Sequence, residues 1–159
     1  ATPWHQDGQY WPIRPLATCT VWLAVDDANE KNGCLKFIRG SHRDKNLKQH
    51  EFNEDKNLTL HQELLKSEFN EKESVNLILK RGQISLHDVY LVHGSDANLS
   101  SKSRRGMTMR FMPTTSVFDH NLAKEKYNNL NVSKYSNRKI YLARGYDKSK
   151  RNNLEVVNF

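Results

Sequence analysis

The chain has 159 residues, of which 36% are hydrophobic and 27% are charged, and its formal net charge is +7. This length predicts one domain over residues 1–159, and only two cysteines, Cys19 and Cys34, exclude a disulfide framework and favour a reducing, cytoplasmic setting. No apolar run approaches the roughly 20 residues of a membrane helix, and the basic residues are too dispersed for a nucleic-acid groove, so we expect neither a membrane nor a nucleic acid as partner.

The first motif, His5-Gln6-Asp7, stands close to the start of the chain. No sequence element precedes it that could pair with it, so we expect the chain to be an N-terminally truncated fragment. Side chains alternate between the two faces of a strand, which puts the His5 imidazole and the Asp7 carboxylate on one face and Gln6 on the other. This pattern lets one strand supply two metal ligands.

Two strands are predicted after this motif. Residues 18–25 (TCTVWLAV) are apolar or β-branched on both faces, which is typical of a central, buried strand. Residues 26–33 have turn composition, and residues 34–38 form a second short strand. The sequence therefore predicts that these two strands form an antiparallel pair.

Residues 43–74 are charged and rich in asparagine, and we expect them to form a partly helical or irregular insertion. A weak helical periodicity is carried by Leu58, Leu60, Leu64, Leu65 and Phe69. Such a segment is either a lid over a substrate or a solvated insertion, and the sequence favours neither.

The β pattern resumes at residues 75–79, 84–92 and 104–112, whereas the tail from residue 118 is rich in Lys and Asn and weakly patterned. Short strands separated by glycines and polar turns predict a mainly β fold, a jelly roll or double-stranded β-helix.

A third metal ligand is predicted at His93, which follows an apolar run and precedes Gly94 and Ser95. Two histidines and one carboxylate form the facial ligand set that suits Fe(II) and leaves positions open for other ligands. His87 shares the strand parity of His93, so it either orients a ligand, faces the substrate or is structural.

An anion clamp is predicted at Arg104, where a return strand begins after His93. A guanidinium matches a carboxylate in a bidentate manner and keeps its charge. Arg105 faces the opposite side of that strand, whereas Arg110 has the parity of Arg104 and could compete for the clamp or meet the substrate.

Four separated motifs resemble the phytanoyl-CoA dioxygenase family in their order and spacing, and the resemblance covers about two-thirds of the chain. They are HQDGQYWPIRP at residues 5–15, NGCLKFIRGSHR at residues 32–43, HGS at residues 93–95, and the downstream Arg104. The resemblance implies a double-stranded β-helix that uses Fe(II), 2-oxoglutarate and O2.

Site residues are carried over from the family motif by motif. The resemblance makes His5, Asp7 and His93 the iron ligands and Arg104 the partner of the far carboxylate of 2-oxoglutarate. It places Ser95 and Trp22 near the same cosubstrate. The nearby aromatic residues either line the pocket or belong to the core: Trp4, Tyr10 and Trp11.

The implied reaction decarboxylates 2-oxoglutarate to succinate and CO2 while hydroxylating a small molecule or an acyl thioester. Related halogenases have a small residue in place of the carboxylate ligand, so the presence of Asp7 argues against halogenation. The alternative is a non-catalytic, cupin-like module that binds a metal or a small molecule without turnover.

Overall fold

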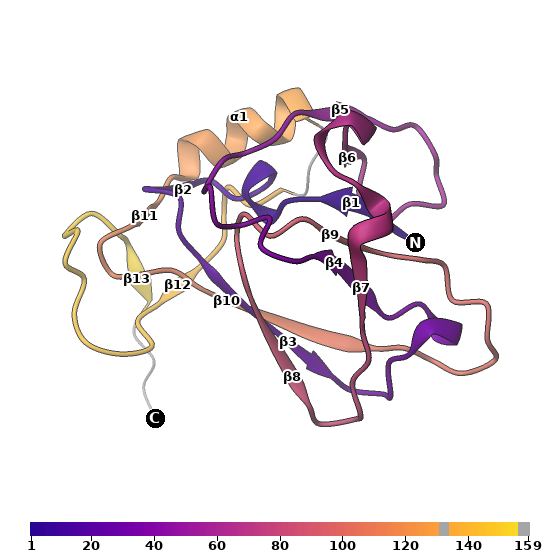
Figure 1. The fold of residues 1–159 in the computed structure, drawn as a ribbon. Helices are drawn as coiled ribbons and strands as arrows, with labels where there is room; N and C mark the ends of the chain where they lie inside the picture. Colours follow the sequence, from indigo (N-terminus) through magenta and orange to yellow (C-terminus); the bar gives the residue numbers. More distant parts are fainter. Residues whose placement is uncertain (131–133, 156–159) are drawn as a thin grey trace.

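The computed structural model describes residues 1–130 and 134–155 and contains two main β-sheets, which Figure 1 shows one below the other. The upper sheet has the antiparallel strand order β1-β9-β4-β7, and the lower sheet has the order β10-β3-β8. The predicted mainly β jelly roll is confirmed. The bounds are β1 Thr2–His5, β3 Cys19–Ala24, β4 Leu35–Ile38, β7 Ser74–Leu77, β8 Ile84–Asp88, β9 His93–Ser95 and β10 Gly106–Phe111.

Smaller elements surround the two sheets. Three short strand pairs are β2 Ile13–Arg14 with β11 Val117–Phe118, β5 His50–Phe52 with β6 Gln62–Leu64, and the parallel pair β12 Ile140–Tyr141 with β13 Leu154–Glu155. The helical elements are α1 His120–Leu130 and the 3-10 turns Asp7–Gln9, Glu30–Asn32, Lys66–Glu68 and Glu71–Glu73. In Figure 1, α1 lies at the top of the molecule, on the side of β1 and β2.

Strand β3 confirms the central strand predicted at residues 18–25, since it lies between β8 and β10. Its inward side chains, Thr20, Trp22 and Ala24, are buried. The expected burial of both faces is wrong, because the outer face of this sheet is open. Its exposed apolar side chains are Ile84, Leu86 and Met107.

The predicted pairing of residues 18–25 with residues 34–38 is also wrong. Strand β4 pairs with β7 and β9 in the other sheet, whereas β3 pairs with β8 and β10. The turn between them is a capped 3-10 turn that ends at Gly33 with a φ of 73°. Trp22, Ala28 and Cys34 share one core cluster, so the chain crosses from one sheet to the other over that core.

The strand predicted over residues 84–92 divides into β8 and β9. Asp88 causes the break, since its carboxylate and its carbonyl accept hydrogen bonds from the backbone N–H groups of Tyr90 and Leu91. Val89 and Val92 are fully buried within the turn. The chain therefore leaves the lower sheet after Asp88 and enters the upper sheet at His93.

The insertion at residues 43–74 consists of the β5–β6 hairpin, two 3-10 turns and loops. Its helical content is limited to these 3-10 turns, and Leu64, one of the leucines that carried the helical periodicity, lies in β6 instead of on a helix face. Leu64 is 1% exposed and packs with Ile38 and Val92 in a core cluster. The insertion is therefore an integral part of the fold beside β1.

Helix α1 lies in the tail that the sequence pattern left unassigned. Asp119 caps it, because its carboxylate accepts hydrogen bonds from the backbone N–H groups of Asn121 and Leu122. Ala123 is its one buried residue, which explains the weak apolar pattern.

Within residues 1–130 and 134–155, no helix is long and apolar enough to cross a membrane.

Candidate metal centre

Three buried side chains converge at the predicted metal site. One ligand atom from each of His5, Asp7 and His93 lies within 4.8 Å of the others, and the three residues are at most 7% exposed. His5 ends β1 directly opposite His93, the first residue of β9. Asp7 begins a 3-10 turn after Gln6, whose extended backbone preserves the predicted alternation.

Backbone carbonyls fix both imidazole rings. Nδ1 of His5 is 2.9 Å from the carbonyl oxygen of Pro3, and Nδ1 of His93 is 2.8 Å from that of Leu91. A proton on Nδ1 donates to each carbonyl and leaves the Nε2 lone pair for a metal. The His5 Nε2 atom is 3.9 Å from Asp7 Oδ1, so these atoms face the same point.

Burial sets the charge of the site. It lowers the pKa of His5 to about 3, with a further contribution from His93, and it also lowers the pKa of His93. Burial raises the pKa of the Asp7 carboxyl, but the contact with His87 and the positive charge of Arg110 outweigh this effect and hold it well below its usual range. Two neutral imidazoles and one carboxylate result, which is the protonation state that a divalent metal requires.

The Asp7 carboxylate has partners on both oxygens. The Thr20 hydroxyl donates to Oδ2 at 2.8 Å, and Nη2 of Arg110 donates to Oδ1 at 3.0 Å. Nε2 of His87 lies 3.6 Å from Oδ2, and its ring centroid is 4.8 Å from that of His93. His87 reaches the site from the lower sheet and His93 from the upper one. The two residues are therefore not on one strand, and the predicted shared parity is not the reason that they meet.

The predicted cosubstrate residues lie around the same cavity, which has a volume of about 330 Å³. Trp22 and Arg104 line it, and Nη2 of Arg104 donates to Ser95 Oγ at 3.4 Å. Nε of Arg104 is buried and has no hydrogen-bond partner within the described part of the chain. A carboxylate would satisfy this donor, so the residues present fit an anionic cosubstrate.

The structure separates the competing arginines. Arg105 pairs on the surface with Asp26, at 2.8 Å between Nε and Oδ2, as its opposite parity predicts. Arg110 enters the metal cavity, and its guanidinium lies 4.6 Å from the ring centre of Trp11. Thr20, which contacts Asp7, also belongs to the site, and its strand parity with Trp22 is the sequence signal that could have identified it.

The candidate aromatic residues divide between the site and the core. Tyr10 and Trp11 line the metal cavity, and the Tyr10 hydroxyl donates to the carbonyl oxygen of Gln62 at 2.7 Å. Trp4 instead packs on Phe69, at 5.2 Å between ring centroids. Only the first two of these aromatics therefore belong to the site.

Comparisons with known proteins give one family. The family model described as phytanoyl-CoA dioxygenase (PhyH) matches residues 1–106. A phytanoyl-CoA dioxygenase domain-containing protein 1 homolog of Dictyostelium discoideum is 33% identical over 112 residues, which cover 68% of this chain and 39% of that protein. The peroxisomal phytanoyl-CoA dioxygenase of Homo sapiens is 30% identical over 114 residues, covering 69% of this chain and 32% of that protein. The chain thus spans between about a third and two fifths of the length of these curated relatives.

Solved structures give the same fold. EvdO2 from Micromonospora carbonacea var. aurantiaca, in a complex with 2-oxoglutarate, has a TM-score of 0.60 and 26% identity, over 70% of this chain and 44% of that one. The non-heme monooxygenase ThoJ, in a nickel complex, has a TM-score of 0.59 and 21% identity, over 96% of this chain and 47% of that one. The second match supports the fold alone, and it extends over nearly the whole chain.

Proposed function

Because the chain belongs to the phytanoyl-CoA dioxygenase family, we propose that it is the metal-binding part of a non-haem Fe(II)/2-oxoglutarate-dependent oxygenase. The observation that carries this proposal is the buried group of His5, Asp7 and His93, whose ligand atoms lie within 4.8 Å of one another. Two imidazoles and one carboxylate are the ligand set of non-haem Fe(II) oxygenases.

His5, Asp7 and His93 would hold Fe(II), which when bound with 2-oxoglutarate and O2 supplies the oxidising chemistry that hydroxylates a C–H bond and releases succinate and CO2. The chain's own contribution is to present neutral imidazoles and a charged carboxylate in fixed orientations. The two histidines are at most 7% exposed, so their burial limits contact with bulk water.

Arg104 would bind the far carboxylate of 2-oxoglutarate, with Ser95 and Trp22 beside it. Its guanidinium is free to do so, since its one hydrogen bond in the described structure is the 3.4 Å contact with Ser95. The likeness to EvdO2, whose solved complex contains 2-oxoglutarate, supports this assignment. The substrate is a small molecule.

An anaerobic titration with Fe(II) and 2-oxoglutarate tests the proposal. The wild-type chain should develop a weak visible charge-transfer band, and a chelator should abolish it. Asp7→Ala should lose the band, and Arg104→Ala should require at least about tenfold more 2-oxoglutarate, because a charge-assisted hydrogen bond contributes about 1.5–3 kcal/mol.

Arg105→Ala is the matched control, since Arg105 pairs with Asp26 at the surface. It should bind 2-oxoglutarate as the wild type does. A wild-type chain that binds Fe(II) but shows no band with 2-oxoglutarate and makes no succinate would instead indicate a non-catalytic binding module.

A further inference from the structure

A second and larger cavity, of about 550 Å³, lies next to the metal cavity. Trp11 and Arg110 line both cavities, so these two side chains separate them. Most of the second cavity is formed by the end of β10 and by residues 138–154. Residues 107–159 lie outside the part of the chain that the family model matches, so all of the lining except Trp11 and Ile13 lies outside that match.

The wall of this cavity is largely apolar. Its apolar lining includes Ile13, Met112, Phe118, Ile140 and Leu142. A concave space of roughly 300–1,000 Å³ with apolar walls and a few polar groups is typical of small-molecule sites. The cavity is therefore large enough for a ligand with a substantial apolar body.

The charged residues of the lining are mostly basic. Besides Arg110, they are Arg138, Lys139, Arg144 and Asp147. The Asp147 carboxylate already accepts hydrogen bonds from the hydroxyl of Ser149 and the side-chain amide of Asn152. With four cations and one carboxylate, the lining has a net positive charge, and this positive field favours an anionic ligand.

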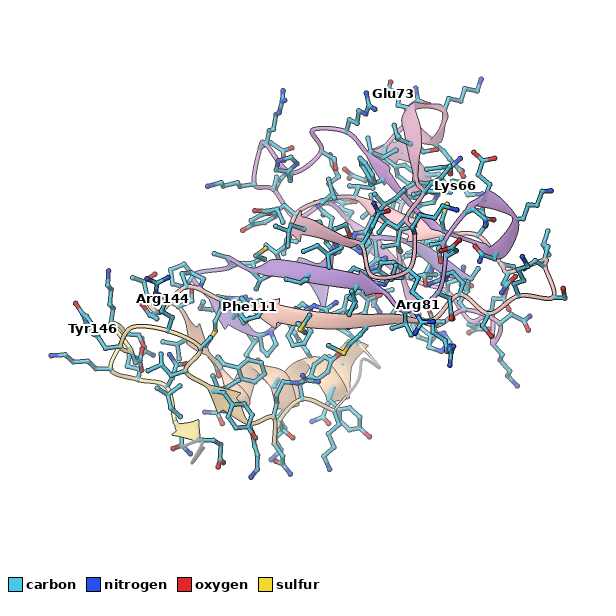
Figure 2. The ribbon with its side chains drawn as sticks, turned by 90° about the horizontal axis from the view of Figure 1, so that it is seen from below. Lys66, Glu73, Arg81, Phe111, Arg144 and Tyr146 are labelled. Carbon is cyan, nitrogen blue, oxygen red and sulfur yellow. The ribbon has the colours of Figure 1, made fainter. Side chains whose placement is uncertain are left out.

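Arg144 is the cation best placed to bind an anion. Lys139 pairs with Glu155 at 3.6 Å, and the guanidinium of Arg138 lies over the ring of Trp11 at 5.3 Å. Arg144 has no ion pair within residues 1–130 and 134–155. Figure 2 shows Arg144 beside Phe111 at the end of β10, and both residues line the cavity.

We propose that this cavity is the substrate chamber and that it binds an amphiphilic anion, with the apolar body inside and the anionic group at Arg144. This assignment rests on the proposed function. The anionic group is a carboxylate or a phosphate monoester, both of which match a guanidinium fork. Carbon atoms at the opposite end of the ligand then reach Trp11 and Arg110, which border the metal site, so oxidation occurs away from the anionic group.

Arg110 has a specific position in this arrangement. It donates to Asp7 on the metal side, and its guanidinium lies over the Trp11 ring at the border of the chamber. A ligand in the chamber therefore contacts Arg110, which is hydrogen-bonded to the predicted metal ligand Asp7. This contact connects the occupancy of the chamber to the metal site.

Calorimetric titration of the full chain, without added metal, tests the chamber with three probes of equal chain length: decanoate, decyl phosphate and 1-decanol. All are used below the concentrations at which they aggregate. At least one of the two anions should bind, and the alcohol should bind at least about fivefold more weakly, since it lacks the charge pair.

Arg144→Gln should weaken binding of the anion about fivefold without changing that of 1-decanol, and Leu142→Glu should weaken both anions further by placing a like charge in the wall. Arg151→Gln is the matched control, because Arg151 is an exposed arginine outside the lining. Circular dichroism checks that each variant is folded.

Equal affinity for the alcohol and the anions, equal effects of Arg144→Gln and Arg151→Gln, or no binding by any probe would each overturn the inference. These results are independent of the charge-transfer band with Fe(II) and 2-oxoglutarate. A band without anion binding would leave the proposed function standing and reject the chamber. Anion binding without a band would reject the proposed function and, with it, the role of this cavity as a substrate chamber.

Discussion

The side chains of the candidate metal centre are held in place by other parts of the protein. Each histidine has its Nδ1 atom within hydrogen-bond distance of a backbone carbonyl, and each oxygen of Asp7 accepts a hydrogen bond, one from Thr20 and one from Arg110. Groups that orient metal ligands commonly change metal affinity 10- to 100-fold when they are lost. Thr20 is the best of these to test, because it touches only one oxygen of Asp7 and is fully buried.

Thr20→Val should weaken the binding of Co(II), a spectroscopic substitute for Fe(II), about tenfold or more, because the hydroxyl no longer fixes Asp7 Oδ2. Valine keeps the shape of threonine, and Thr20→Ser, which keeps the hydroxyl, should restore most of the affinity. The Co(II) absorption spectrum reports both the affinity and the ligand geometry. Valine and wild-type proteins with the same Co(II) affinity and spectrum would refute a positioning role for Thr20.

At the scale of elements, the site depends on segments that hold β1 and its following turn. The Gln6 side chain is fully buried; its amide donates to the carbonyls of Asn46 and Tyr90, and its carbonyl accepts from the backbone N–H of Lys48. Gln6 thus joins the His5-Gln6-Asp7 motif to the insertion and to the turn between β8 and β9. His50 adds a further contact, since its Nε2 atom accepts from the backbone N–H of Gln6.

Gln6→Leu should lower the free energy of unfolding by about 2–4 kcal/mol, because it removes three part-buried hydrogen bonds to backbone groups of Asn46, Lys48 and Tyr90. Urea denaturation measures this change. Gln9→Leu is the control, since the Gln9 side chain makes a single hydrogen bond, at 3.3 Å to Gln62, and is only partly buried. Equal stability losses in the two variants would show that Gln6 does not hold these segments together.

Strand β10 must approach Trp22 closely. A Cβ atom at Gly106 would overlap the indole ring of Trp22, which lines the metal cavity. Gly106→Ala should therefore destabilise the protein by about 1–3 kcal/mol and displace the indole, which weakens binding of 2-oxoglutarate. Thermal unfolding and the charge-transfer titration measure the two effects.

Met107→Ala is the comparison for Gly106→Ala, because Met107 is the next residue of β10 and is 47% exposed on the open face. It should change stability by less than about 0.5 kcal/mol. If Gly106→Ala behaved in the same way, close contact between β10 and Trp22 would not be a constraint.

At the scale of the whole molecule, the site exists because two sheets meet around one cavity. The upper sheet provides His5 and His93, and the lower sheet provides Thr20, His87 and Arg110. Burial between the sheets keeps the two ligand histidines neutral in the folded chain. The unfolded chain exposes them to water, so the folding equilibrium depends on pH.

The metal-free chain should lose stability as the pH falls below about 6.5. The pKa of His5 is lowered to about 3 and that of His93 is also lowered, so between the folded and the ordinary values the unfolded chain binds more protons. The contribution is complete above the ordinary histidine pKa and declines towards pH 3. Asp7, whose pKa is also lowered, adds a loss in the same direction below about pH 4.

Urea midpoints measured from pH 8 to pH 4 test this dependence. His5→Gln removes one of the two titrating groups and should make the slope between pH 6.5 and pH 4 shallower. A constant midpoint across this range in the wild type would contradict the burial of neutral histidines.

The sequence by itself determined the class of the fold and which residues come together at the candidate metal centre. The identities of His5, Asp7, His93 and Arg104 follow from motifs whose residue types suit a metal and an anion, and the alternation of short apolar runs indicates a β architecture. These features are local, so they can be recognised without knowing which strands are neighbours.

Tertiary structure alone decided how these parts meet. It broke the run at residues 84–92 at Asp88, sent residues 34–38 into the opposite sheet, and brought Thr20 and Arg110 onto the Asp7 carboxylate. It also placed residues 138–154 of the tail near the end of β10, where they line the second cavity. The physical reason is that strand pairing and burial are long-range choices: a strand's own sequence specifies which side chains share a face but not which strand or which side chains that face will meet.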